Sequence, residues 1–551
     1  MNTEKRENHT KINFYSREVS IIGIGCTPFT DNPEPSDITE KELLSYAALK
    51  AIEDAGISPK EIDFYFHGQT HPSIDSDSQI TEWFGMKGKG MLCHSEGSST
   101  GYLALEQAAN AVASGKYEVV LSACVDLADR SWPWKQPSDP STELCLDDAA
   151  ITYQRRYGLT DEEIDDTLIC MALANRKNAS KNPLAVKQIP YEEIAKQMEI
   201  DDVYTFMKSN ARIGQILRPS GLGLTCDGAA AIVVASTKWA AEHELPHTPI
   251  EILGIGCAGA DRNTPHYETL AMEEAIRQVY ELTQITPDEI DLLTVNDPII
   301  STQLIAAEVS GYLPKGESWK YFVKGRTAYD GDKPINTHGG RTSFGHAQAA
   351  SGLADIYEAV LQMRGSAGER QVKELPITTL LCSGGENSIA ILMETNESMR
   401  KDDQTAHCTD SPIKFEAMTK KYHENLEAGK IVGRKCKICG HIEWPPHPAC
   451  NECGSMDLEW VEMSGKGMIE RFILDPQAEY MDLIPYALAS VTMDGVSQNT
   501  IVQGISLENA EDCWAMMPVP VKAKIIEKGK PGKTVKTVLF ELDQKEIEKR
   551  K

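Results

Sequence analysis

Short apolar runs alternate along the chain up to residue 395 with longer segments whose apolar positions recur at helical spacing. Residues 19–26 form such a run, and their length and β-branched content predict a buried strand. Residues 39–55 repeat leucine, alanine and isoleucine at helical spacing and stop at a glycine, which is typical of a helix end. A strand (61–67), a helix (101–114) and a strand (119–124) follow. This β-α-β-α-β order predicts an α/β fold with helices on the faces of its sheets.

The same order of elements returns after residue 250, because the chain nearly repeats itself. Residues 21–26 read IIGIGC and residues 252–257 read ILGIGC, while ISPKEID at 57–63 returns as ITPDEID at 285–291. The spacing between the two segments is almost unchanged, which indicates two similar half-domains with a site where they meet. The second copy predicts strands at 250–256, 290–295, 378–382 and 388–393, and helices at 268–282 and 349–363.

Departures from this pattern set the expected boundaries. The expected units are a polar tail (1–18), a first half (19–249), a second half (250–395), a polar linker (396–412), a helix with a cysteine cluster (413–460) and a small barrel of short alternating strands (461–551). Residues 127–220 interrupt the first half with helices near 161–178 and 191–199 and no clear sheet. We expect this insertion to be a loop region that sets substrate choice.

Composition narrows the class of protein. A chain of 551 residues is too long for one hydrophobic core, and its apolar (41%) and charged (25%) fractions are typical of a soluble globular protein. The net charge of −27 argues against nucleic-acid binding. No apolar run approaches the roughly 18 residues that span a bilayer, and the N-terminus lacks the apolar stretch of a secretory signal, so we expect a cytoplasmic protein. Its fourteen cysteines are then expected to be thiols or ligands, not disulfides.

Two Cys-x-x-Cys knuckles stand in the C-terminal unit, each followed by a glycine that permits a tight turn. They supply four thiolates, from Cys436, Cys439, Cys450 and Cys453. This spacing predicts a structural zinc ribbon and disfavours the alternative of four buried free thiols. Because all four positions come from the protein, the site is closed and not catalytic. Single-stranded nucleic-acid binding by a ribbon and a barrel is disfavoured by the acidic balance and by the lack of interleaved basic and aromatic residues.

Five motifs in the duplicated part stand in an order that resembles the thiolase superfamily, specifically its sterol-carrier-protein type. They are GYLALEQAA…ASG (101–115), DGAAA (227–231), NTHGG…GHA (336–347), QMRG (362–365) and CSGG (382–385). The resemblance implies a duplicated, five-layered αβαβα fold and a homodimer. Residues 415–545 resemble the zinc-ribbon and OB-fold domain that accompanies many such thiolases as a separate subunit. Fusion would hold the two parts at high effective concentration.

The resemblance also implies the roles of individual residues on a coenzyme A thioester. His346 matches the family base, Cys382 the cysteine that moves the α-proton, and Asn296 the oxyanion position. Gly384 and Gly385 would bring backbone amides to a carbonyl oxygen. Without the resemblance, His346 is an ordinary capping or core histidine, Cys382 is one more buried thiol and Asn296 is a turn residue.

The chain departs from the family pattern at the nucleophile. The family cysteine lies seventeen residues before the glycine that ends its helix, and counting back from Gly115 gives Ser98. The nearest cysteine, Cys93, lies five residues earlier, too far to substitute. A serine hydroxyl is far less acidic than a thiol, whose ordinary pKa is about 8.5. Ser98 is therefore either an acyl acceptor that depends on His346 or a small residue that leaves space for substrate.

Three hypotheses of function follow. The first is an acyltransferase that makes or breaks a carbon–carbon bond beside the thioester by Claisen chemistry, with Ser98 in place of the cysteine. The second is a retro-aldolase that cleaves a 3-hydroxyacyl-CoA without a covalent intermediate. The thiolase-like aldolases that this chain resembles also lack the cysteine. They differ from this chain, however, in having tyrosines at the positions of Asn296 and His346. The third is a non-catalytic scaffold that binds acyl-CoA or lipid.

Overall fold

The computed structural model describes residues 13, 15, 17–31, 37–70, 80–128, 148–259, 267–384, 387–403, 416–474, 484–530 and 533–550. The chain divides into two compact units. The first comprises residues 1–35, 43–78 and 89–410, and the second comprises residues 36–42, 79–88 and 411–551.

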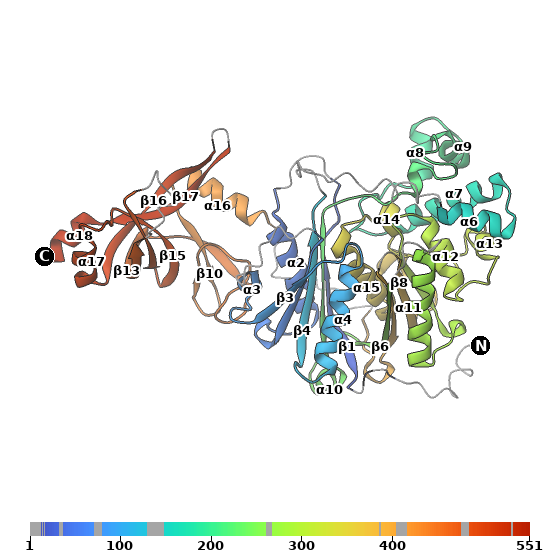
Figure 1. Ribbon diagram of the computed structural model, residues 1–551, viewed down its shortest axis with the longest axis horizontal. Coiled ribbons are helices and arrows are strands. Elements are labelled where there is room, and N and C mark those ends of the chain that lie inside the picture. The colour runs from blue at the N-terminus through green and yellow to red at the C-terminus, as the bar shows by residue number, and fades with distance from the viewer. Residues whose placement is uncertain are drawn as a thin grey trace. The chain divides into compact units, whose positions relative to one another are not determined.

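A nine-stranded mixed sheet organises the first unit, in the order β3-β2-β4-β5-β1-β6-β9-β8-β7 (Figure 1). The strands are β1 (Val19–Cys26), β2 (Phe64–Gly68), β3 (Gly90–His94), β4 (Val119–Asp126), β5 (Gly228–Ser236), β6 (Ile250–Gly259), β7 (Leu292–Asn296), β8 (Thr378–Ser383) and β9 (Asn387–Thr395). Among the described strands, the two halves of this sheet join where β1 meets β6, through the pairs Ser20–Glu251 and Ile21–Ile250. The sequence repeat thus corresponds to two half-sheets.

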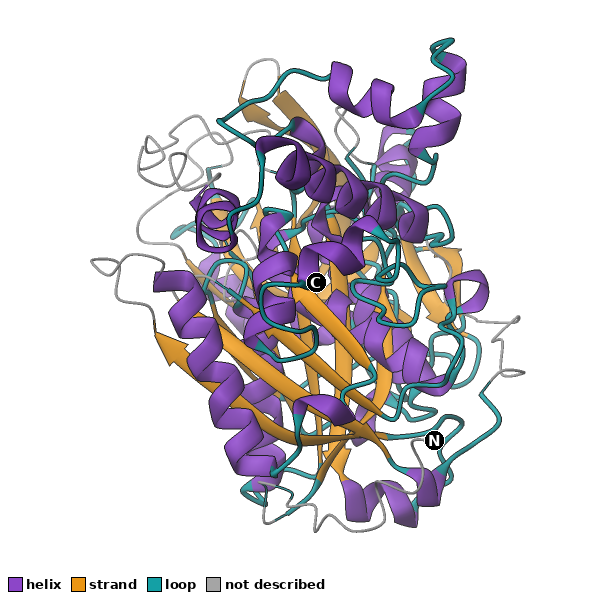
Figure 2. Ribbon diagram, turned by 90° about the vertical axis from the view of Figure 1, so that its right-hand side faces the viewer, coloured by secondary structure: helices purple, strands orange, loops and turns teal. Residues whose placement is uncertain are grey.

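Helices pack on both faces of these half-sheets, and Figure 2 shows the strands enclosed between layers of helices. Helix α15 (Gln348–Arg364) contacts strands of both halves, β4 and β5 on one side and β7 and β8 on the other, and it also packs against α4 (Thr100–Ala113). Helix α11 (Tyr267–Thr283) covers β6 and β9. A central helical pair between two half-sheets with further helices outside confirms the predicted α/β architecture.

Glycines set how closely the outer helices approach the two half-sheets. A Cβ atom at Gly25 of β1 would lie 2.1 Å from the Ala47 carbonyl oxygen of α2 (Glu40–Asp54). A Cβ atom at Gly256 of β6 would lie 2.1 Å from the Ala275 carbonyl oxygen of α11. The repeated glycine motif therefore lets an equivalent helix backbone touch an equivalent strand in each half.

The second repeated motif forms the same turn in both halves. The Ser58 backbone amide donates to Glu61 Oε2 at 2.7 Å, and the Thr286 amide donates to Glu289 Oε2 at 2.8 Å. Both turns are capping boxes, in which a side chain and a backbone amide satisfy each other. At the end of each turn an aspartate precedes one strand and accepts from the start of the parallel strand beside it: Asp63 from the Val119 amide of β4 and Asp291 from the Thr378 amide of β8, both at 3.1 Å.

Within residues 127–220, the described part is helical and contains no strand. Its helices are α6 (Asp148–Tyr157), α7 (Asp161–Ala179), α8 (Tyr191–Gln197) and α9 (Val203–Ser209). The remaining helices in the described part of this unit are α10 (Thr237–Glu242), α12 (Ser301–Val309), α13 (Ser318–Val323) and α14 (Gly340–Ser343). None of the described helices is both long and apolar enough to cross a bilayer.

The second unit combines a small sheet with a closed barrel. The sheet, in the order β11-β10-β12, comprises β10 (Val432–Cys436), β11 (Ile442–Glu443) and β12 (Leu458–Glu462). The barrel, in the order β13-β14-β15-β17-β16, comprises β13 (Lys466–Leu474), β14 (Tyr486–Met493), β15 (Val496–Gln503), β16 (Val519–Lys530) and β17 (Lys533–Leu542). Its helices are α3 (Ile80–Trp83), α16 (Met418–Glu427), α17 (Ala510–Met516) and α18 (Gln544–Arg550).

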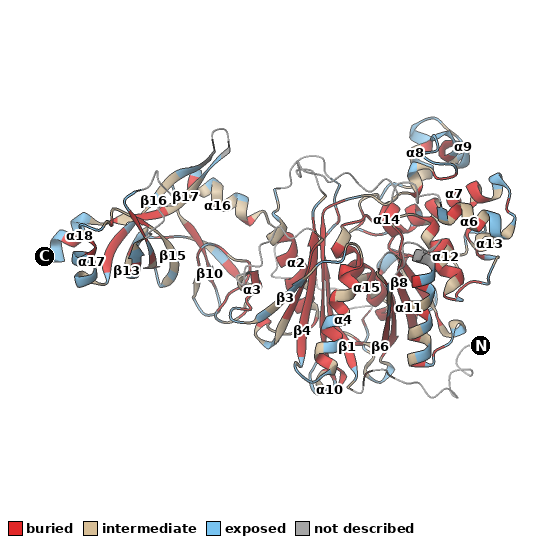
Figure 3. Cartoon of the chain, viewed as in Figure 1, coloured by how far each residue is buried: buried red, intermediate tan, exposed pale blue. Residues whose placement is uncertain are grey.

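Alternating burial along the barrel strands explains why they close on themselves. Inward residues such as Val491, Val502 and Phe540 are buried, whereas intervening positions are half-buried or exposed (Figure 3). A strand with one buried face gains most when its sheet encloses a core. The barrel confirms the prediction made from the short alternating segments.

Candidate functional site

The N-terminal ends of the two central helices come together, one from each half. A Cβ atom at Gly101 of α4 would lie 2.6 Å from the Ala349 carbonyl oxygen of α15, and one at Gly352 would lie 2.7 Å from the Tyr102 ring. The absence of side chains at these two glycines lets the helix backbones touch. Ser98 and His346, which immediately precede the two helices, are thereby carried to the same region.

Asn296 lies against the start of α4. It ends β7 and is the register partner of Ser383, which ends the parallel strand β8. Asn296 Nδ2 donates to Ser383 Oγ at 3.3 Å and lies 3.5 Å from the Ser98 carbonyl oxygen. Ser99 Oγ lies 3.3 Å from Ser383 Oγ and donates to the Asn387 carbonyl oxygen at 2.8 Å. The structure thus brings Asn296 to the backbone of Ser98, and it adds two serines that the sequence did not single out.

His346 is buried just before α15. Its Nδ1 atom lies 3.0 Å from Ser351 Oγ, and its backbone amide donates to the Leu224 carbonyl oxygen at 2.7 Å. Burial, and secondarily the positive charge of Arg341, lower the pKa of His346 to about 3. The imidazole is therefore uncharged near neutral pH, and no described residue hydrogen-bonds its Nε2 atom.

Cys382 is fully buried and belongs to the apolar cluster that also contains Val295, Leu380 and Ala390. Burial raises the pKa of its thiol to about 12, so the thiol stays protonated near neutral pH. No hydrogen bond joins it to the described polar residues around Asn296. Side chains alternate along a strand, and it is the adjacent Ser383 that reaches Asn296. Gly384 follows directly, whereas Gly385 lies outside the described residues.

Cys93, the cysteine nearest in sequence, does not replace the missing nucleophile at the start of α4. Cys93 lies on β3 with its side chain exposed, and partial burial raises the pKa of its thiol above the ordinary value. A reactive thiolate needs the opposite shift. Ser98, which the motif resemblance places at the nucleophile position, is half-buried.

Arg341 of α14 is a central residue that sequence reasoning missed. It has no exposed surface, and its Nε atom donates to Asn296 Oδ1 at 2.9 Å. Its Nη2 atom donates to Asp355 Oδ2 and, at 3.0 Å, to the Ser351 carbonyl oxygen. Burial raises the pKa of Asp355, but the Arg341 charge and neighbouring donors outweigh it and leave that pKa below its ordinary value. The only sequence signal was one charged residue inside a motif of small residues.

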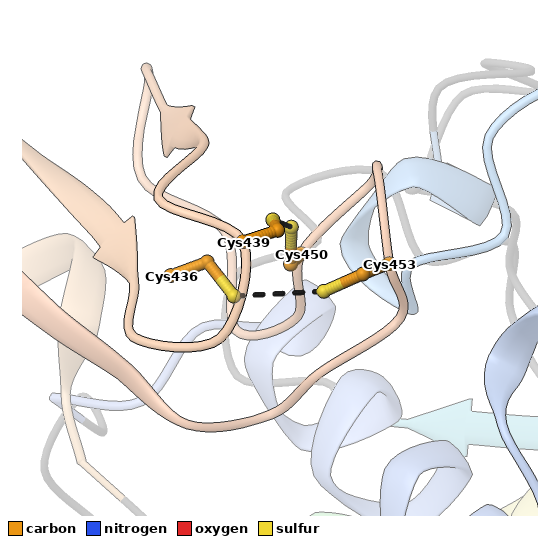
Figure 4. Close-up of side chains that lie close together, drawn as sticks. All are labelled: Cys436, Cys439, Cys450 and Cys453. Carbon is orange, nitrogen blue, oxygen red and sulfur yellow. Dashed lines mark hydrogen bonds between the residues drawn. The ribbon is translucent and has the colours of Figure 1, made fainter.

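The four knuckle cysteines converge in the second unit (Figure 4). Their Sγ atoms all lie within 4.8 Å of one another, and the Cys436–Cys453 and Cys439–Cys450 pairs are both 3.6 Å apart. Tetrahedral zinc with Zn–S bonds of about 2.3 Å sets its sulfurs about 3.8 Å apart. The cluster therefore fits a structural zinc ion, as the spacing predicted.

Two families match parts of the chain. Residues 260–393 match the family described as thiolase C-terminal domain-like, and residues 424–459 match that described as ChsH2, rubredoxin-like zinc ribbon domain. The acetyl-CoA acetyltransferase of Methanothermobacter thermautotrophicus is 28% identical over 400 residues, which cover 68% of this chain and 98% of that protein. Sterol carrier protein 2 of Bos taurus is 26% identical over 392 residues, which cover 64% of this chain and 68% of that protein.

Solved structures show the same fold. The Ltp2-ChsH2(DUF35) aldolase matches with a TM-score of 0.57 and 23% identity, over 70% of this chain and 99% of that one. The Acat5 thiolase from Ascaris suum in complex with coenzyme A matches with a TM-score of 0.51 and 16% identity, over 69% of this chain and 100% of that one. The chain therefore combines a thiolase-like part with a ChsH2-type rubredoxin-like zinc ribbon in one polypeptide, which confirms the resemblance seen in the motifs.

Proposed function

We propose that this chain is a thiolase-like enzyme that breaks or makes a carbon–carbon bond next to a coenzyme A thioester, and that it does so by retro-aldol cleavage of a 3-hydroxyacyl-CoA. One observation carries the proposal. The uncharged imidazole of His346 and the amide donor of Asn296 stand at the paired helix starts, where Ser98 occupies the position that the motif resemblance gives to the nucleophilic cysteine. The names of the relatives, acetyltransferase and aldolase, support the same class of reaction.

In the proposed reaction, the thioester carbonyl oxygen lies at the start of α4, within reach of Asn296 Nδ2. His346 accepts the proton of the 3-hydroxyl group as the C2–C3 bond breaks, and an aldehyde or ketone leaves. The electron pair of that bond becomes an enolate, whose negative oxygen is stabilised by the amide donor and the helix N-terminus. Cys382 is the proposed proton donor to C2 on the motif resemblance: burial keeps its thiol protonated, and because the thiol lies on the opposite face of β8 from Ser383, the step requires C2 to reach that face.

Claisen chemistry is the second candidate, and the acetyltransferase relatives favour it. Ser98 Oγ would attack the 3-oxo carbonyl carbon while His346 removes its proton. The C2–C3 bond would then break, its electron pair would leave as the enolate of the shorter acyl-CoA, and protonation at C2 would release that thioester. The acyl group would then pass from Ser98 to the thiol of free coenzyme A. This route requires an acyl-serine, whereas the retro-aldol route forms no bond between enzyme and substrate.

The two routes differ in their products. The purified full chain is incubated with 3-hydroxyacyl-CoA alone and, separately, with 3-oxoacyl-CoA plus free coenzyme A. A released aldehyde or ketone without added coenzyme A supports retro-aldol cleavage. A shortened thioester that requires free coenzyme A, with acyl mass on Ser98, supports the Claisen route instead. Binding without any product would overturn both and leave a scaffold.

A matched pair of variants shows whether any activity belongs to the proposed site. His346→Ala should lower kcat/KM by about 10²- to 10⁴-fold, the usual worth of a general base. His243→Ala, which changes an exposed histidine of the same unit, should leave it unchanged. Two further expectations belong to this proposal: a homodimer through the thiolase-like part, testable by light scattering, and a cytoplasmic location.

A further inference from the structure

Resting on the proposed function, we infer that Arg341 is a positioning residue that fixes the orientation of the Asn296 amide, with Asp355 as its buried counter-ion. A guanidinium carries only donors, so the atom of Asn296 that faces Arg341 must be the acceptor Oδ1. The Nδ2 group is thereby turned toward Ser383 and the start of α4. The side that faces the thioester oxygen is then a donor.

The alternative orientation would oppose the reaction. An asparagine amide presents a donor on one side and an acceptor on the other, and the surrounding hydrogen bonds decide which side faces where. Rotated by half a turn, Asn296 would aim its carbonyl oxygen at the developing enolate oxygen and repel it. The remaining contacts of Nδ2, at 3.3 and 3.5 Å, are long and would constrain this choice weakly.

Arg341 is itself held rigidly. Its backbone amide donates to Asp297 Oδ1 at 2.8 Å, and its guanidinium reaches Asp355 and the Ser351 carbonyl oxygen. Asp355 also accepts from the Tyr102 hydroxyl, and its other oxygen lies 3.0 Å from His338 Nε2. Neither charge has exposed surface, so the Asn296 amide meets a donor that cannot turn toward solvent.

Ser351 links this arrangement to the other proposed catalytic group. Its carbonyl oxygen accepts from Arg341, while its hydroxyl lies 3.0 Å from His346 Nδ1. One buried cation therefore orients the amide donor directly and the imidazole through a shared neighbour. A buried ion pair is often replaceable by apolar side chains without loss of stability, so stability alone does not explain its presence.

The test separates positioning from stability. Arg341→Met should lower kcat at least 100-fold with KM changed only a few-fold, comparable with loss of an oxyanion donor. Arg341→Lys keeps a positive charge and a hydrogen-bond donor, and its kcat should be at least tenfold higher than that of Arg341→Met. The double variant Arg341→Met/Asp355→Leu should regain the thermal midpoint but not kcat. Arg370→Met is the matched control, because it breaks another buried ion pair, with Glu358, and should leave kcat unchanged.

Wild-type kcat in Arg341→Met, or in the stabilised double variant, would overturn the inference. A crystal structure of Arg341→Met provides a readout that does not depend on turnover. It tests the positioning role of Arg341 even if the wild type cleaves no acyl-CoA. The Asn296 amide should there be turned or displaced from Ser383. An Asn296 amide that keeps its position and hydrogen bonds without Arg341 would refute the positioning role.

Discussion

The cysteines of the two units have opposite surroundings: those of the zinc ribbon cluster together, whereas that of the proposed catalytic site is isolated. In the zinc ribbon, four Sγ atoms lie within 4.8 Å of one another and belong to two turns separated by the ten residues 440–449. In the thiolase-like unit, Cys382 lies alone among apolar side chains with a protonated thiol, and Ser98 stands before α4 where the motif resemblance predicts a cysteine. The comparison teaches that a thiol's role follows from its neighbours more than from its presence in a motif.

The two sites also differ in how far apart their parts lie along the chain. The ribbon is assembled within residues 436–453, whereas Asn296 reaches a serine 198 residues away. A local site survives as long as its own turn folds. A long-range site depends on the helix contact at Gly101 and Gly352, and so on both halves of the unit at once.

Removing one sulfur from the ribbon should have the largest effect. Cys436→Ser should abolish zinc binding and unfold much of the second unit, because structural zinc in finger peptides contributes about 10–16 kcal/mol. Zinc content by mass spectrometry and limited proteolysis measure the two effects. Cys257→Ser, which alters an exposed cysteine of the first unit, should keep the metal. Retention of zinc by Cys436→Ser would refute a closed four-thiolate site.

Removing the thiol of Cys382 should lower catalytic activity, whereas removing a ribbon thiol should lower stability. Cys382→Ala should lower turnover by about 100-fold through loss of the proton donor, with a stability cost of only about 1–2 kcal/mol from lost burial. Turnover is measured with 3-hydroxyacyl-CoA, and stability by urea denaturation. Cys124→Ala, at another fully buried cysteine, should reproduce the stability cost alone. If both variants behave alike in turnover, Cys382 is a packing residue.

Acid should weaken the thiolase-like unit through its buried imidazole. Because the pKa of His346 is about 3 in the folded state and about 6.5 when unfolded, the unfolded state binds more protons between these values. Stability is therefore lost as pH falls from about 6.5 toward 3, by about 2 kcal/mol at pH 5 from this group. Between pH 7 and pH 5, the free energy of unfolding measured by urea denaturation should fall by about 2 kcal/mol less in His346→Gln than in the wild type. An exposed-site control, His243→Gln, should match the wild type.

The smallest effect is expected where the family has its nucleophile. Ser98→Ala should leave retro-aldol turnover within about tenfold of wild type, since no covalent step is removed. The same variant would be inactive if the reaction passed through an acyl-serine. Steady-state kinetics with 3-hydroxyacyl-CoA decide between the two, and Ser98→Cys tests whether a thiol at this position introduces acyl transfer.

Periodic segments were predictable because their burial pattern is local. The predicted strand 19–26 is β1, and the predicted helices 268–282 and 349–363 differ from α11 and α15 by one residue at each end. Strand β3 was missed, because its five residues include a glycine and lie mostly exposed, which removes the apolar signal.

The candidate site was predictable only in part. His346 and Asn296 could be named because their motifs are contiguous, but the partners that orient them lie far away in sequence. Arg341 could not be assigned a role, since whether a cation is buried depends on which carboxylate the fold brings to it. Ser383 could have been found from strand alternation, because it occupies the opposite face from Cys382.

The paired turns at Ser58 and Thr286 explain why the ancient doubling of this chain can still be read there. Each turn satisfies its own polar groups within a few residues, so a change at one position leaves a specific partner unmatched. Core positions elsewhere accept many apolar substitutes, and there the two copies have drifted apart. The record of a shared origin is thus kept by the hydrogen bonds of two small surface corners, together with the close strand–helix contacts at the repeated glycines.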